Sequence, residues 1–159
     1  MKKNSIDDGD IIRGLGLVAL YTAYLEEMID GCVAGLRIID TASSTSLEKM
    51  SAREKLYHCK KLLMKLENDN VEMNKLIKLI DESLELLQRR NELLHGRIYS
   101  QFEKPALIRS GRSGVPEREI SSAELYDLAT KIFTIFGPLN YAVEYSIPRA
   151  LVALKQLKK

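Results

Sequence analysis

The stretch that decides the fold spans residues 71–96 and reads VEMNKLIKLIDESLELLQRRNELLHG. Its apolar residues recur at intervals of three and four without an interrupting glycine or proline, which is the pattern of an amphipathic helix. The positions that carry this pattern are Leu76, Ile80, Leu84 and Leu87. We therefore expect one long helix from Val71 to about Leu94, ended by Gly96.

The end of this expected helix concentrates polar groups that can act on a phosphodiester. Arginine is a planar, permanently charged fork that suits phosphate oxygens, and histidine exchanges protons near neutral pH. Asn91 and His95 are four residues apart and should be neighbours on one helical face, within reach of Arg90. Cleavage of RNA needs a proton acceptor, a proton donor and positive charge for the transition state. The structural alternative is that these side chains only cap the last helical turn.

The rest of the chain also favours helices. Helical periodicity extends over about residues 6–41, where Gly31 and Gly35 share one face and should permit tight helix packing. Capping-box spacing at Ser51 and again at Ser121 predicts two further helix starts, and Gly137-Pro138 and Pro148 should kink or divide the last helical region. The pattern predicts an all-α single domain over residues 1–159, with about four to six helices around one core.

One segment, at about residues 97–120, breaks this pattern and reads as an irregular basic loop. Because it follows the arginine and histidine cluster directly, we expect it to close over a polyanion, and its alternative is a solvated loop. Arg118 belongs to the same basic segment. The arginines that we expect to bind RNA here and at the helix end are Arg89, Arg97, Arg109 and Arg112.

Composition limits the function classes. The 159 residues include 24 basic and 22 acidic side chains, a net charge of +2, so any nucleic-acid contact must come from a local patch. Cys32 and Cys59 lack zinc or redox spacing, and no clustered ligands suggest a metal or a cofactor. The chain opens without a secretory pattern, and charged residues interrupt its most apolar stretch. These features predict a cytoplasmic protein without a membrane role.

The run Arg90-Asn91-x-x-x-His95-Gly96, late in a helical chain and followed by an irregular segment and another helix, resembles the Arg-x(4–6)-His signature of HEPN domains. The resemblance covers most of the chain. It implies an all-α bundle and a metal-independent endoribonuclease that leaves 2′,3′-cyclic phosphate and 5′-hydroxyl ends. Members act in toxin–antitoxin, phage-defence or RNA-processing systems, and their paired active site forms at a homodimer interface.

By this resemblance, His95 performs acid–base catalysis, Arg90 binds the scissile phosphate and Asn91 orients or supports them. The partners it implies are RNA, a second copy of the chain and, in toxin systems, a cognate antitoxin. Some members carry a tyrosine two residues after the histidine as a target for modification, whereas this chain has Arg97 there and Tyr99 two residues further on. Two other hypotheses compete: a non-catalytic HEPN-like module that binds RNA or a nucleotide, and a helical scaffold.

Overall fold

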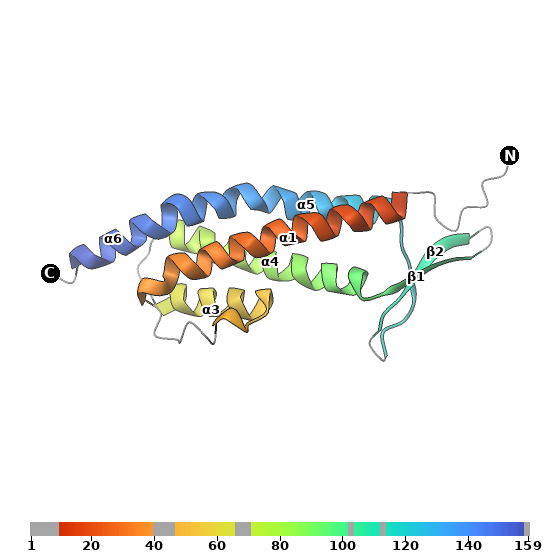
Figure 1. Cartoon of the computed structure of the whole chain (residues 1–159), viewed down its shortest axis with the longest axis horizontal. Coiled ribbons are helices and arrows are strands. Elements are labelled where there is room, and N and C mark those ends of the chain that lie inside the picture. Colours follow the sequence, from red (N-terminus) through yellow and green to blue (C-terminus); the bar gives the residue numbers. More distant parts are fainter. Residues whose placement is uncertain (1–9, 40–46, 66–70, 102–103, 112–113, 158–159) are drawn as a thin grey trace. The chain divides into compact units, whose positions relative to one another are not determined.

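The computed structural model describes residues 10–39, 47–65, 71–101, 104–111 and 114–157. Helices dominate this part of the chain, as Figure 1 shows, so the predicted helical fold class is confirmed. The α-helices are α1 (Asp10–Leu36), α3 (Ala52–Lys65), α4 (Val71–Leu94), α5 (Ser122–Tyr141) and α6 (Ile147–Leu157). A short 3-10 helix, η1 (Arg37–Ile39), follows α1, and a π-helix, η2 (Ala142–Ser146), joins α5 to α6.

The chain forms two compact units, and α1, α4 and α5 each contribute residues to both. The first unit contains the described residues of 1–23 and 86–133, and the second contains those of 24–85 and 134–159.

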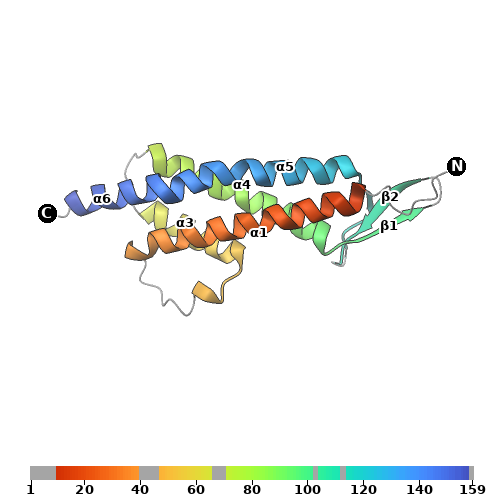
Figure 2. The same ribbon diagram turned by 45° about the horizontal axis from the view of Figure 1, so that its top comes forward.

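The first unit contains a three-stranded antiparallel sheet in the order β1-β2-β3. Its strands are β1 (Arg97–Gln101), β2 (Lys104–Arg109) and β3 (Arg118–Glu119), and Figures 1 and 2 both show β1 continuing directly from the end of α4. The expectation of an irregular segment at 97–120 is therefore wrong for these strands. Ile108 explains why, because it is buried and pairs with both Ile98 and Arg118. Pro105 lies where the β1–β2 register shifts, at an irregularity that tolerates its missing N–H.

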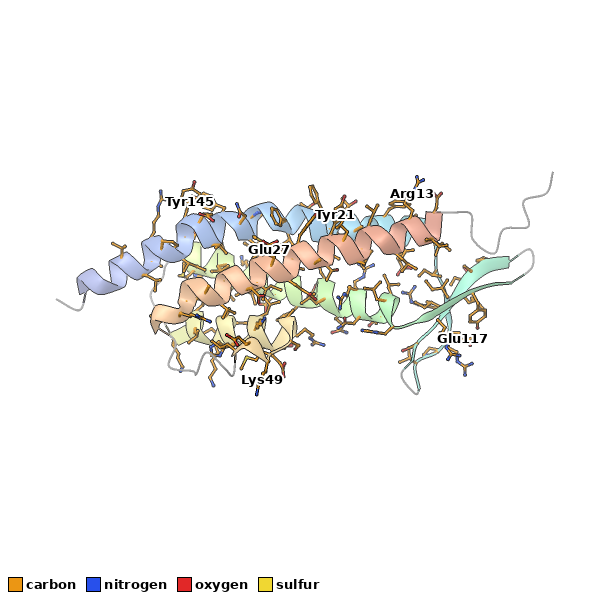
Figure 3. The ribbon with its side chains drawn as sticks, viewed as in Figure 1. Arg13, Tyr21, Glu27, Lys49, Glu117 and Tyr145 are labelled. Carbon is orange, nitrogen blue, oxygen red and sulfur yellow. The ribbon has the colours of Figure 1, made fainter. Side chains whose placement is uncertain are left out.

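The core of the first unit lies between α1, α4 and α5. Its buried apolar side chains include Val18 from α1 and Ile108 from the sheet, together with Leu86, Leu93, Ile120, Leu125, Leu128 and Ile132. Near the surface, the rings of Tyr21 and Phe133 lie 4.9 Å apart, and Figure 3 shows Tyr21 on α1 close to α5.

The second unit has an apolar core with both cysteines inside it. Cys32 and Cys59 are fully buried. An added Cβ would lie 3.3 Å from Val143 at Gly31 and 3.2 Å from Ile147 at Gly35, so the predicted tight packing at these glycines is confirmed, against side chains of the last helical region. Burial raises the pKa of the Cys32 thiol to about 12, so this thiol is un-ionised at neutral pH.

The local sequence signals for the helix boundaries have mixed outcomes. At α3 the capping box is reciprocal: the Glu54 amide donates to Ser51 Oγ at 3.4 Å, and the Ser51 amide donates to the Glu54 carboxylate at 2.7 Å. Gly137-Pro138 was predicted to kink or divide the last helical region, and it does not divide it, because helix α5 continues through Pro138 to Tyr141. The irregularity is instead the π-helix η2, whose wider turn directly precedes α6 and Pro148.

Candidate functional site

The end of α4 brings the predicted catalytic side chains to the edge of the sheet. The His95 amide donates to the Asn91 carbonyl at 3.2 Å, so helical hydrogen bonding continues one residue beyond Leu94. Gly96 then turns the chain into β1. An added Cβ on Gly96 would lie 2.6 Å from Ile108 carbons and 2.8 Å from the Glu92 carbonyl oxygen, so only glycine permits this close approach.

A cleft of about 360 Å³ lies in the first unit at this point. One side of its lining comes from α4, and the rest comes from β2, from the segment that follows β2, and from β3. The residues that line the cleft are Asn91 and Glu92 from α4, His95 directly after it, and Ile108, Ser110, Gly111, Val115, Pro116 and Arg118. Its size is at the lower end of the range of small-ligand sites, roughly 300–1,000 Å³.

Two of the three predicted catalytic residues line this cleft directly. His95 is exposed and Asn91 is half-buried, and both are in the lining. Arg90 is half-buried and outside the lining, but its Nη1 donates a hydrogen bond to Asn91 Oδ1 at 2.8 Å. The Arg90 guanidinium is therefore connected to the cleft through the side chain of Asn91.

Three of the four arginines predicted to bind RNA are among the described residues, and these three lie outside the cleft lining. Arg89 is half-buried on α4, whereas Arg97 on β1 and Arg109 on β2 are exposed. Arg97 and Arg109 are paired positions of neighbouring strands, so their side chains share one face of the sheet. Two like charges directly opposite each other repel, and a bound anion would relieve that repulsion. Arg112 lies outside the described residues.

Glu117 partly neutralises this sheet face. Its carboxylate accepts a hydrogen bond from the Tyr99 hydroxyl, and it lies 3.6 Å from Arg109 Nε. The hydrogen bond to Glu117 raises the pKa of Tyr99, with smaller contributions from burial and from the carboxylate charge. Figure 3 shows Glu117 beside the strands, in the segment between β2 and β3.

Arg118 lines the cleft as well, although it is not among the predicted site residues. Its Nη1 and Nη2 each donate to the Glu124 carboxylate at 2.8 Å, and Nη1 also donates to the Glu119 carbonyl at 3.0 Å. The hydrogen bonds to Glu124 raise the pKa of Arg118 most, and the charges of Glu124 and Glu92 raise it further. Ser121 caps α5, because its Oγ accepts a hydrogen bond from the Glu124 amide at 3.2 Å.

The sequence carries a signal for two acidic residues near Arg118, Glu92 and Glu124. Glu92 is three residues before His95, so helical geometry alone places it near the histidine face. Glu124 is the acidic member of the predicted capping box, and it lies six residues after Arg118. The sequence gives no comparable signal for Ile108, Val115 and Pro116, whose place in the cleft depends on the strand pairing.

Comparison of the chain with protein-family models, with curated proteins and with solved structures found no match. Of the helices in the described part of the chain, none is long and apolar enough to span a membrane. Nor do the described residues include a cluster of three or more histidine, cysteine, aspartate or glutamate side chains that could hold a metal ion.

Proposed function

We propose that this protein is a metal-independent endoribonuclease of the HEPN type, with its active site at the cleft of the first unit. The observation that carries the proposal is the grouping of His95, Asn91 and Arg90: the first two line one cleft, and the third is hydrogen-bonded to the second. These residues also form the Arg-Asn-x-x-x-His-Gly run that resembles the HEPN signature. The biological role we propose is that of a toxin or defence component, controlled in a toxin system by a cognate antitoxin.

The proposed reaction is attack of a ribose 2′-hydroxyl on the adjacent phosphorus. A base removes the 2′-hydroxyl proton, the new O–P bond forms as the bond to the 5′-oxygen breaks, and an acid protonates that departing oxygen. His95 is the proton-transfer residue, and the guanidinium of Arg90 stabilises charge on the phosphate. The products are a 2′,3′-cyclic phosphate end and a 5′-hydroxyl end.

A homodimer is part of the proposal because His95 is the only histidine in the cleft lining. A second copy related by a twofold axis would bring a second His95, so that one imidazole accepts a proton while the other donates one. Light scattering should therefore report twice the chain mass at micromolar concentration. A monomer mass across that range would contradict the composite site.

A second candidate function, an RNA- or nucleotide-binding module without catalysis, is favoured by the acidic groups near Arg118. Glu124 binds its guanidinium, and the charge of Glu92 acts on it as well. These carboxylates reduce the positive charge that this side of the cleft could offer to a transition state. Under this alternative the cleft binds a nucleotide but no bond is broken.

The experiment that separates the two candidates is incubation of the wild type with mixed RNA in EDTA, followed by analysis of the product ends. The endoribonuclease proposal predicts cleavage with 2′,3′-cyclic phosphate and 5′-hydroxyl ends, and no products from His95→Ala. RNA that is bound but never cut would favour the binding module. Cleavage by His95→Ala at the wild-type rate would overturn the proposed mechanism.

A further inference from the structure

Arg118 lines the cleft, and one edge of its guanidinium makes no hydrogen bond among the described residues. Of its five N–H donors, three are used: two on Nη1, to Glu124 and Glu119, and one on Nη2, to Glu124. The two remaining donors are the Nε–H and the second Nη2–H, and neither has a partner among the described residues. These two donors lie on the same edge and point in parallel, in the geometry that pairs with two adjacent acceptors.

Glu92 offers acceptors in the same cleft. Its side chain is exposed, it lines the cleft from α4, and its charge acts on Arg118 without a hydrogen bond between them among the described residues. A carboxylate has two oxygens that can accept two parallel N–H donors. The cleft therefore combines a pair of donors with a pair of acceptors, close enough for their charges to interact.

The charges on this side of the cleft favour an uncharged ligand group over a phosphate. Arg118 contributes one positive charge, and Glu92 and Glu124 contribute two negative charges, so the set is net negative when all three are ionised. Apolar surface from Ile108, Val115 and Pro116 completes the lining. A planar, neutral ring that carries both donors and acceptors fits this combination, and a nucleobase is such a ring.

We infer that the cleft recognises an unpaired guanine in RNA, with Glu92 and Arg118 as its specificity residues. Guanine offers its N1–H and N2–H donors to a carboxylate, and its O6 and N7 acceptors to an arginine fork. N1–H and O6 are neighbours on the ring, so the two recognising groups must be close to each other, as Glu92 and Arg118 are. Adenine, cytosine and uracil each satisfy only part of this set. The inference rests on the proposed function, since it names the base that the endoribonuclease would select.

Binding of the four nucleoside 3′-monophosphates to the full chain tests this inference without requiring catalysis. All four probes carry the same phosphate, so calorimetric affinities compare the bases alone. We expect guanosine 3′-monophosphate to bind about 10- to 100-fold more tightly than the other three, because one well-formed bidentate pair discriminates by that order. Glu92→Gln should remove most of this preference, since an amide has one acceptor where the carboxylate has two.

Glu119→Gln is the matched control. It removes the same charge from an exposed position on β3 that is outside the cleft lining, and the carbonyl that Arg118 uses at this residue is main chain. The control should keep the guanine preference. Equal affinity of the wild type for all four nucleotides would overturn the inference, as would an unchanged preference in Glu92→Gln.

Mapping of cleavage positions separates failure of this inference from failure of the proposed function. Cleavage of mixed RNA with no enrichment of guanine at the cut sites would overturn the inference and leave the endoribonuclease proposal standing. A guanine preference in binding that depends on Glu92, in a protein that cuts no RNA, would support the inference and overturn the endoribonuclease. Wild-type cleavage that is enriched at guanine, together with the loss of this enrichment in Glu92→Gln, would support both the inference and the endoribonuclease proposal.

Discussion

The two units use their charged side chains differently. In the second unit, two ion pairs between helices each match one base with one acid: Lys55 with Asp30 and Lys60 with Asp81, both at 2.6 Å. The first unit also has a matched pair, Lys131 with Asp127 at 2.7 Å, but two of its sets are unequal: Arg118 meets Glu124 and the charge of Glu92, while Glu117 serves both Arg109 and Tyr99. A matched pair leaves little for a ligand, whereas Arg118 and Glu92, which both line the cleft, have donors and acceptors left for one. The comparison supports a structural role for charges in the second unit and a binding role in the first.

We expect the largest loss of RNA cleavage among these variants from a substitution of Arg90 in the first unit. Arg90→Ala should reduce RNA cleavage by about 10²-fold or more, because it removes the charge that stabilises the phosphate in the transition state. Cleavage rates of one defined RNA measure the loss, and thermal unfolding should show that the fold persists.

Arg53→Ala in the second unit is the matched control for Arg90→Ala. Arg53 is also a half-buried helical arginine with one side-chain hydrogen bond, from Nη2 to the Tyr57 hydroxyl at 3.4 Å. We expect its loss to leave the cleavage rate unchanged. Equal losses in the two variants would remove the functional distinction between the units.

A smaller effect is expected at the exposed arginine pair of the sheet. Arg97→Gln combined with Arg109→Gln should weaken RNA binding and reduce its salt dependence, by a slope of about 0.7 for each single-strand phosphate that the variant no longer neutralises. Cleavage of bound RNA should persist, since neither residue lines the cleft. Binding isotherms at several salt concentrations measure the slope, with Lys61→Gln plus Lys65→Gln on exposed positions of α3 as the charge-matched control. An unchanged salt slope in the arginine variant would show that Arg97 and Arg109 do not contact RNA phosphates.

The smallest effect concerns the buried thiol of the second unit. The folded pKa of Cys32, about 12, exceeds the value of about 8.5 for an unfolded thiol. The stabilisation that Cys32 contributes is therefore full below about pH 8.5, and it is lost as the pH rises toward 12. Over that window the free energy of unfolding should fall by up to about 1.4 kcal/mol per pH unit on account of this group.

Urea unfolding of the wild type and of Cys32→Ala at pH 8 and at pH 10.5 measures the contribution of the thiol. The difference between the two proteins should change with pH by about 1–3 kcal/mol, because the alanine variant lacks the titrating group. Parallel pH dependences in the two proteins would show that this thiol ionises as easily in the folded chain as in the unfolded one.

The sequence predicts the helical parts of the site well because their signals are local. Helix α4 has the expected bounds, and the four-residue spacing of Asn91 and His95 correctly predicts two neighbours, which both line the cleft. The sheet is different, since its strands are short and Pro105 interrupts the pattern. Arg118 reaches the cleft because β3 pairs with β2, opposite Ile108. A pairing between distant segments depends on tertiary packing, which periodicity does not report.

We propose that the catalytic histidine, His95, lies in the first unit rather than the second. The most direct measurement is the rate at which wild type, His95→Ala and His58→Ala cleave one RNA in EDTA. His58 is half-buried on α3 in the second unit, so the two variants remove the same chemical group from different units. We predict that His95→Ala loses about 10²-fold or more of the rate and that His58→Ala keeps the wild-type rate. A wild-type rate in His95→Ala, or an equal loss in His58→Ala, would contradict the account.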